Sequence, residues 1–171
     1  MNSQSDPVFE RFLDAQLDTA LAFAADSDIV RLFPVAPDRF LVNFHTPSLA
    51  GDPTGGLREV TEITVGIQLF PHHLREYDPG TVTILDPPDL WHPNVRGPFV
   101  CLGHLNAGVS IPDLLHQLFD VFRWENYAMH DALNREASAW ARHQPSTHFP
   151  LDKRPLRHPR TPAHPPTSVI S

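Results

Sequence analysis

Apolar side chains recur every three or four positions from residue 7 to residue 25, and acidic side chains lie off this stripe. The spacing predicts an amphipathic helix that packs on another element. Asp6, directly before Pro7, is placed to cap the first turn of this helix. The stripe consists of Phe9, Phe12, Leu13, Gln16, Leu17, Ala20, Leu21 and Ala24.

Two short apolar segments follow, over residues 29–34 and 39–44, and their β-branched and aromatic side chains are typical of strands. The turn-like residues 35–38 separate them, so the pattern predicts a β-hairpin. Residues 46–57 contain two prolines and three glycines. We therefore expect a loop over this stretch.

A third and a fourth strand are predicted further along the chain. Residues 60–70 alternate between apolar and polar side chains until Pro71, and residues 81–85 form a shorter segment of the same kind. Residues 86–100 contain four prolines and have the periodicity of neither a helix nor a strand. We expect a long irregular loop there, leading to Cys101.

Two more helices are expected in the second half of the chain. Residues 110–113, with Ser110 first and Asp113 last, fit a capping box, and the apolar positions behind them predict a helix that ends near Arg123. Asp131 is placed to cap a last helix that continues through Arg142. The side chains of this helix expected to face inward are Leu133, Ala137 and Trp140.

The composition changes after residue 144. Seven of the 19 prolines lie in the last 28 residues, which carry a net charge of +3, whereas the first 143 residues carry −10. We therefore divide the chain into a domain, 1–144, and a Pro-rich basic tail, 145–171. The tail is expected to be an appendage that is at least partly disordered, and the alternative is a strap laid across the domain.

Length and charge exclude several classes of protein. A chain of 171 residues is long enough for one domain with a core and too short for two of ordinary size. It has no apolar run long enough to span a membrane and no secretory signal, so we expect a cytoplasmic protein with no membrane partner. A net charge of −7 argues against nucleic acid as a partner, because gripping a phosphate backbone needs clustered Lys and Arg.

Cys101 is the only cysteine, so it forms no disulfide within the chain. It is either an inert small hydrophobic side chain or a thiol used in chemistry. A sole thiol on a rigid loop suits a reaction that accepts an acyl group from another thioester and passes it to an amine, because no second thiol can capture that group. A side-chain amide beside the thiol can stabilise the oxyanion formed in each transfer. Asn94, seven residues upstream, offers such an amide.

Four segments together resemble the core of ubiquitin-conjugating enzymes. They are Trp91-His92-Pro93-Asn94-Val95, the pair Cys101-Leu102, the helix that begins after Ser110, and Asp131-Ala132-Leu133-Asn134-Arg135-Glu136-Ala137. The resemblance covers about Ile29 to Arg142, and the combination is much more specific than any one segment. It implies an α+β fold with an N-terminal helix, a four-stranded antiparallel sheet, a cysteine loop and two C-terminal helices, and it implies no cofactor or metal.

The resemblance also implies roles for individual residues. Cys101 would carry the thioester, and Asn94 would stabilise the oxyanion, the alternative being a loop residue that bonds its own backbone. Asp131 would orient the acceptor lysine and assist its deprotonation, the alternative being a helix cap. His92 and Pro93 would hold the loop in shape, with His92 as a general base the alternative.

The chain departs from the family at several positions, and these differences limit which partner proteins we expect. Residues 70–79 keep only the start of the family's ligase-docking motif, the first helix is acidic where relatives are basic, and Val109 replaces a common tryptophan. In these departures the chain resembles bacterial ubiquitin-conjugating-like proteins that are encoded in anti-phage defence islands. That group implies a ubiquitin-like protein or the C-terminus of a nucleotidyltransferase as partner, together with an activating enzyme where the system has one.

Three other interpretations of the residues stay open. The chain could be a non-catalytic binding scaffold with the same fold, although the retained Cys101 argues against that. It could be a cysteine hydrolase with His104 or His116 as the base, which requires a Cys–His pair within hydrogen-bond reach. A metal site at Cys101 and His104 has ligand spacing but lacks the second pair of ligands that structural zinc sites use.

Overall fold

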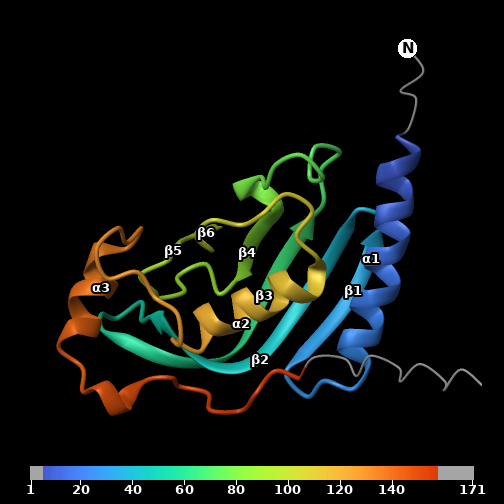
Figure 1. The fold of residues 1–171 in the computed structure, drawn as a ribbon. Coiled ribbons are helices and arrows are strands. Elements are labelled where there is room, and N and C mark those ends of the chain that lie inside the picture. Colours follow the sequence, from blue (N-terminus) through green and yellow to red (C-terminus); the bar gives the residue numbers. More distant parts are fainter. Residues whose placement is uncertain (1–5, 158–171) are drawn as a thin grey trace, which may run out of the picture.

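The computed structural model describes residues 6–157 and shows a mixed α+β fold. A long helix is followed by a four-stranded antiparallel sheet in the order β1-β2-β3-β4, and further helices follow the sheet (Figure 1). The main elements are α1 (Pro7–Ala25), β1 (Val30–Ala36), β2 (Arg39–Gly51), β3 (Leu57–Gln68), β4 (Val82–Asp86), α2 (Ile111–Phe122) and α3 (Arg135–Arg142). The smaller elements are the β5–β6 hairpin (Val95–Arg96 and Phe99–Val100) and the 3₁₀ turns η1 (Pro79–Thr81) and η2 (Ser146–His148).

The expected first helix is confirmed as α1. The Asp6 carboxylate accepts a hydrogen bond from the backbone N–H of Val8 at 2.9 Å, which satisfies one of the free amides of the first turn. Most of the apolar stripe faces the sheet, but Leu21 is 42% exposed. The buried face of α1 is Phe9, Leu13, Gln16, Ala20 and Phe23.

The expected hairpin is confirmed as β1 and β2, but β2 is longer than the sequence pattern indicates. It continues to Gly51, so the loop expected over 46–57 is wrong in its first half. The pairing with β3 shifts between His45 and Ser48, and this irregularity accommodates Pro47, which has no N–H for the ladder. The true loop is the short turn between β2 and β3, where Gly55 and Gly56 adopt φ of +98° and +87°.

The remaining sheet and the first C-terminal helix follow the expectation. β3 and β4 match the third and fourth predicted strands within a few residues, and the irregular stretch after β4 contains only the small β5–β6 hairpin. The Ser110 side chain caps α2 by accepting from Asp113 N–H and donates to the Asp113 carboxylate at 2.7 Å. α2 lies along one face of the sheet and supplies many of the fully buried core side chains (Figure 1).

The expected cap of the last helix is wrong. α3 begins at Arg135, and its N-cap is Asn134, whose side-chain oxygen accepts from Ala137 N–H at 3.0 Å. Asp131 therefore does not cap the helix. Leu133, expected to face inward, lies before the helix and is 40% exposed, whereas Ala137 is fully buried.

The chain after residue 144 continues to pack on the domain. Residues 145–157, which we call the strap, run along the edge of the molecule below β2 (Figure 1). The Phe149 ring stacks on Trp124 with centroids 4.9 Å apart, and Leu156 is only 8% exposed within the main core. The packed chain thus extends past the expected boundary at residue 144. The rest of the expected tail, 158–171, lies outside the described residues.

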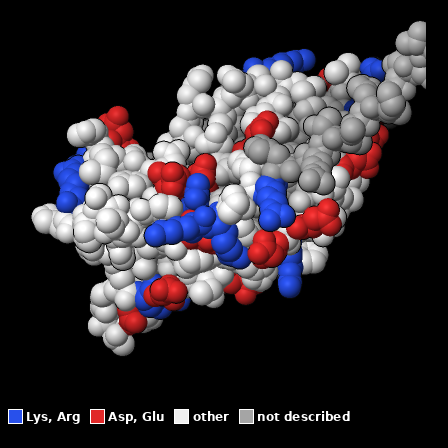
Figure 2. Space-filling view, turned by 60° about the horizontal axis from the view of Figure 1, so that its bottom comes forward, with Lys and Arg blue, Asp and Glu red and all other residues white. Residues whose placement is uncertain are grey.

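Polar contacts hold the strap as well. Asp152 is 4% exposed and accepts from the Thr46 hydroxyl at 2.8 Å, at the irregularity of β2. Arg154 Nη2 contacts the Asp152 carboxylate at 2.7 Å, and Arg154 Nη1 lies 3.4 Å from Asp28 beyond α1. One basic side chain of the expected tail, Arg154, is thus paired with acidic ones, and Figure 2 shows basic and acidic groups intermingled on this face. Within residues 6–157, no helix is long and apolar enough to cross a membrane.

Candidate active site

The Asn94 side chain joins three segments around the cysteine. Its Nδ2 donates to the carbonyl of Cys101 at 2.9 Å, and its Oδ1 accepts from Ala128 N–H at 2.7 Å. The backbone N–H of Cys101 donates to the Asn94 carbonyl at 2.8 Å, so the two ends of the β5–β6 hairpin are bonded to each other. Asn94 is only 7% exposed. These bonds fix the backbone at Cys101 relative to the loop that follows α2.

His92 lies beneath this loop and is fully buried. Its Nδ1 accepts from the backbone N–H of Asn94 at 3.0 Å, so the proton of the neutral ring resides on Nε2. Burial lowers the pKa of His92 to about 3, which keeps the ring neutral at neutral pH. This arrangement places His92 as a loop support and gives it no basic nitrogen free to act on solvent or substrate.

The loop between α2 and α3 lies against the same site. The carbonyl of Pro93 accepts from Asn134 N–H at 3.0 Å, so the residue that caps α3 also binds the H-P-N segment. The carbonyl of Met129 accepts from the side chains of Ser138 and Arg142 on α3. The helix therefore positions the loop, and the loop positions Asn94.

Trp124 supports the site from below and was not singled out by sequence reasoning. Its indole is fully buried, with the His92 ring 4.6 Å away on one side and the stacked Phe149 ring on another. It takes a positive φ of 64° just after α2, a position where glycine is usual. Burial of so large a side chain offsets the cost of this conformation, of the order of 1–2 kcal/mol. The only available signal was an aromatic residue at an expected helix end.

Cys101 directly follows β6 and is an exposed free thiol. No hydrogen bond joins its Sγ to a histidine within the described chain, so the geometry required of a Cys–His hydrolase is not formed. His104 is exposed three residues further on. Among the same residues, no group of three or more His, Cys, Asp or Glu side chains could hold a metal ion.

Asp131 is exposed, and its carboxylate forms no hydrogen bond or ion pair in the described part of the chain. It lies three residues before Asn134, which binds Pro93, and three after Ala128, which binds Asn94. The structure thus places Asp131 on the loop that borders the site and leaves its carboxylate unengaged.

Tyr77 is a second residue that sequence reasoning missed. Its hydroxyl is buried and has no hydrogen-bond partner among residues 6–157. Burial is the main cause that raises the pKa of Tyr77 to about 12, and the negative charges of Asp78 and of a Cys101 thiolate add to it. The phenol is therefore protonated at neutral pH. A tyrosine 24 positions before the cysteine gives no sequence signal of this proximity.

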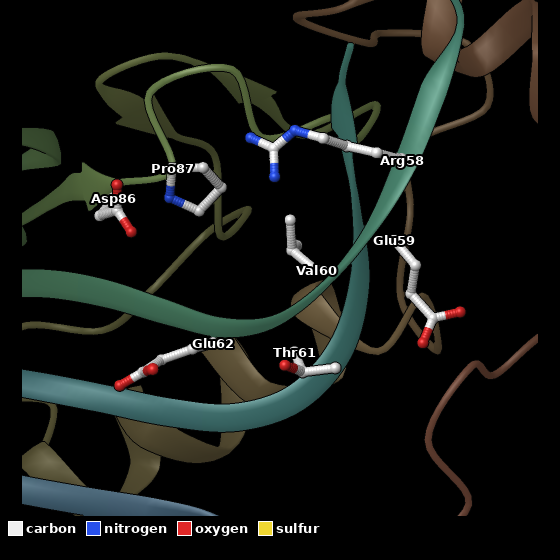
Figure 3. Close-up of a pocket in the computed structure, with 7 residues that line it drawn as sticks. All are labelled: Arg58, Glu59, Val60, Thr61, Glu62, Asp86 and Pro87. Atoms are coloured by element: carbon white, nitrogen blue, oxygen red, sulfur yellow. The ribbon is translucent and has the colours of Figure 1, made fainter.

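A surface hollow of about 370 Å³ lies away from these residues, between β3 and the turn after β4 (Figure 3). Its lining includes Arg58, Glu59, Glu62 and Asp86, and the Arg58 guanidinium is engaged by the Asp89 carboxylate at 3.1 Å. An open hollow lined by charged side chains lacks the apolar walls of a small-molecule site. None of the candidate catalytic residues lines it.

No protein-family model matches the chain, and no curated protein matches it in sequence.

Proposed function

We propose that the chain is a ubiquitin-conjugating-like enzyme that carries an acyl group as a thioester on Cys101 and transfers it to an amine. The observation that carries the proposal is the bonded loop around the thiol. Asn94 of the H-P-N segment donates to the carbonyl of the only cysteine, above the buried His92. The order of helix, four-stranded antiparallel sheet and further helices agrees with the fold that the resemblance implies.

The chemistry needs two acyl transfers. In the first, the Cys101 thiolate attacks the carbonyl carbon of a donor thioester, and the donor thiolate leaves. In the second, an amine attacks the new thioester, the carbonyl electron pair moves to oxygen, and the intermediate collapses with loss of the Cys101 thiolate and of one proton from nitrogen. An exposed thiol on a rigid backbone suits both steps, because each partner must reach the same sulfur.

Asn94 and Asp131 have distinct proposed roles. One amide hydrogen of Asn94 binds the Cys101 carbonyl, so the second one is available to an acyl oxygen. The unengaged Asp131 carboxylate would accept a hydrogen bond from the incoming lysine and assist its deprotonation. His92 and Pro93 would act only through the shape of the loop.

The proposed partner is a ubiquitin-like protein or the C-terminus of a nucleotidyltransferase, in bacterial anti-phage defence. The support is the set of sequence departures in the first helix and in residues 70–79. The alternative of a non-catalytic scaffold has less support, because the thiol is exposed and its loop is bonded in place.

The test uses a defined acyl donor, the acetylglycyl thioester of 2-mercaptoethanesulfonate, with free lysine as acceptor. We expect intact-mass analysis to show one acyl group on the wild-type protein, released by thiol reductant and discharged to lysine. Cys101→Ser should give a slower adduct that reductant does not cleave, and Cys101→Ala should give none. An equal adduct on Cys101→Ala would refute the assignment, and discharge to water as fast as to lysine would favour the hydrolase.

A further inference from the structure

The β5–β6 hairpin that leads to Cys101 alternates between exposed and buried side chains. Phe99 and Cys101 are exposed, whereas Val100 between them is 6% exposed and Leu102 is 7% exposed. The bond from Cys101 N–H to the Asn94 carbonyl at 2.8 Å continues the pairing of the hairpin by one residue. Side chains two positions apart in a strand point to the same face. The Phe99 ring therefore lies on the face that carries the thiol, about 7 Å along the strand from Cys101.

A positive charge lies beside this ring. Arg96 pairs with Phe99 across the hairpin, and the side chains of directly opposite residues share a face, with their Cβ atoms about 4.5–5.5 Å apart. Arg96 is exposed, and its guanidinium forms no ion pair within residues 6–157. The surface next to the thiol thus consists of an aromatic ring and an unpaired cation.

The hairpin is held firmly against the rest of the protein. The carbonyl of Pro98 accepts from the Ile84 N–H of β4 at 2.8 Å, so the hairpin lies beside the edge strand of the main sheet (Figure 1). At Gly97 the backbone is so close to the preceding loop that a Cβ would lie 2.5 Å from the Pro88 carbonyl oxygen. A surface fixed in this way can bind a peptide without first being ordered itself.

The exposure of Phe99 is unusual for this chain. At 60% it is the most exposed of the Phe, Tyr and Trp side chains among residues 6–157. The hairpin packs on the core through Val95 and Val100 on its other face, so the fold itself makes little use of the ring. Aromatic side chains and arginine are enriched among the residues that dominate binding at protein interfaces. The pair is therefore placed to bind a group that is brought to the thiol.

The two ends of the hairpin differ in what surrounds them. At the Asn94 end, the loop between α2 and α3 borders the hairpin through the bond from Ala128 N–H to the Asn94 side chain. This loop also carries Asp131, the proposed contact of the acceptor amine. At the turn end, residues 96–99 are all exposed. The acyl donor therefore has free access over the turn end while the amine approaches over the loop.

We propose that the hairpin face with Phe99 and Arg96 binds the C-terminal peptide of the acyl donor, and that this peptide is apolar and acidic near its end. This inference rests on the proposed function and names the class of its donor. Phe99 contacts an apolar side chain close to the acylated residue, and Arg96 attracts a carboxylate there. The whole chain carries a net charge of −7, so its overall field favours a basic peptide. A preference for an acidic peptide therefore has to come from Arg96.

The first test compares the acetyl-leucyl-glycyl and acetyl-glycyl-glycyl thioesters of 2-mercaptoethanesulfonate at concentrations below saturation. We expect wild type to be acylated about 3-fold to 10-fold faster by the leucyl donor, because its side chain is partly buried on the ring. Phe99→Ala should lower this ratio to below about 2. Phe33→Ala removes a ring that is 48% exposed on β1, at the opposite edge of the sheet, and should keep the ratio.

The ratio separates binding from a structural effect, since a loosened thiol loop would slow both donors alike and leave their ratio unchanged. A ratio near 1 in wild type, or one that Phe99→Ala leaves as it was, overturns the proposal.

The second test changes the charge of the donor. At low ionic strength, wild type should be acylated about 3-fold to 10-fold faster by the acetyl-glutamyl-glycyl thioester than by the acetyl-arginyl-glycyl thioester, and added salt should reduce the difference. Arg96→Glu should reverse the preference. Arg31→Glu, the same change at an exposed position of β1, should keep it. A preference for the arginyl donor in wild type, or a glutamyl preference that survives Arg96→Glu, overturns the proposal.

The same measurements distinguish this inference from the proposed function. If no donor acylates wild type, or if Cys101→Ala is acylated equally, the proposed function fails and this inference fails with it. If all four donors acylate Cys101 at equal rates, the proposed function stands and only the inference about the donor is refuted.

Discussion

Asn94 holds the loop around Cys101 in place, and the same side chain is the one that we propose to bind the acyl oxygen. Its oxygen and one amide hydrogen are used inside the protein, by Ala128 and by the Cys101 carbonyl, and the other hydrogen remains for a substrate. Its first effect is therefore on the backbone of the cysteine. Because Asn94 is only 7% exposed, water does not easily replace these bonds when the side chain is removed.

We expect Asn94→Ala to lower the free energy of unfolding by about 1–3 kcal/mol, because it leaves two partly buried backbone groups, the Cys101 carbonyl and the Ala128 N–H, without their partner. For a domain of this size, each kcal/mol lowers the thermal midpoint by about 2–4 °C. Discharge to lysine, measured where the variant is fully folded, should also slow. Asn106→Ala, at an exposed position in the next loop, is the control and should change neither quantity. Undiminished stability together with slow discharge would show that Asn94 acts only on the oxyanion.

At the scale of elements, an aromatic cluster connects the strap to the loop around Cys101. Phe149 stacks on Trp124 at an interplanar angle of 4°, and Trp124 meets His92 edge-on. His92 in turn bonds the backbone of Asn94. The cluster has its own buried residues, apart from the main core beneath α2. A change in the packing of the strap can therefore alter the loop around Cys101, because the rings of Trp124 and His92 lie between the two.

We expect Phe149→Ala to destabilise the protein by about 2–4 kcal/mol, because a stacked ring is lost from a buried tryptophan. Urea unfolding followed by tryptophan fluorescence measures the loss. Phe33→Ala removes the same side chain from β1, where Phe33 is 48% exposed, and should cost less than about 1 kcal/mol. Equal losses for the two variants would contradict the supporting role of Phe149.

The elements and most of their limits could be predicted from the sequence, because periodicity and caps are local signals. The apolar stripe indicates α1, and the capping box at Ser110 indicates the start of α2. Asp131 and Asn134 are both good cap residues, and Asn134, which caps α3, is also held by a bond from its N–H to the Pro93 carbonyl, 41 positions away. Long-range contacts of this kind also explain why Trp124 and Tyr77 were missed.

At the scale of the whole molecule, the strap closes the fold over its own sheet. Leu156 enters the main core, and Asp152 binds Thr46 where β2 is irregular. The Arg154 guanidinium holds the Asp152 carboxylate and is the leading cause that lowers the pKa of Asp152 against the effect of burial. The proline-rich composition predicts a partly disordered appendage. This prediction misses the strap, because composition does not show which surface a segment packs on.

Two truncated proteins test whether the strap is part of the folded domain. A protein ending at residue 157 keeps the described contacts of the strap, whereas one ending at residue 144 loses the Phe149 stack, the Asp152 bonds and Leu156 from the core. We expect the shorter protein to be less stable by at least about 3 kcal/mol, since burial of one such side chain is worth about 1.5–3 kcal/mol. Thermal unfolding of both proteins measures this difference. Equal midpoints would show that the domain ends near residue 144 after all.

The position of Phe149 also bears on synthesis of the protein. A ribosome releases the chain from its N-terminus, at about 5–20 residues per second, so Cys101 emerges before the strap. Until Phe149 follows, Trp124 lacks its stacking partner and the ring beneath His92 is only partly supported. The nascent protein therefore presents its thiol before the loop around it is held in place. The support of the loop around Cys101 is completed only when Phe149, 48 residues downstream of the cysteine, has been synthesised.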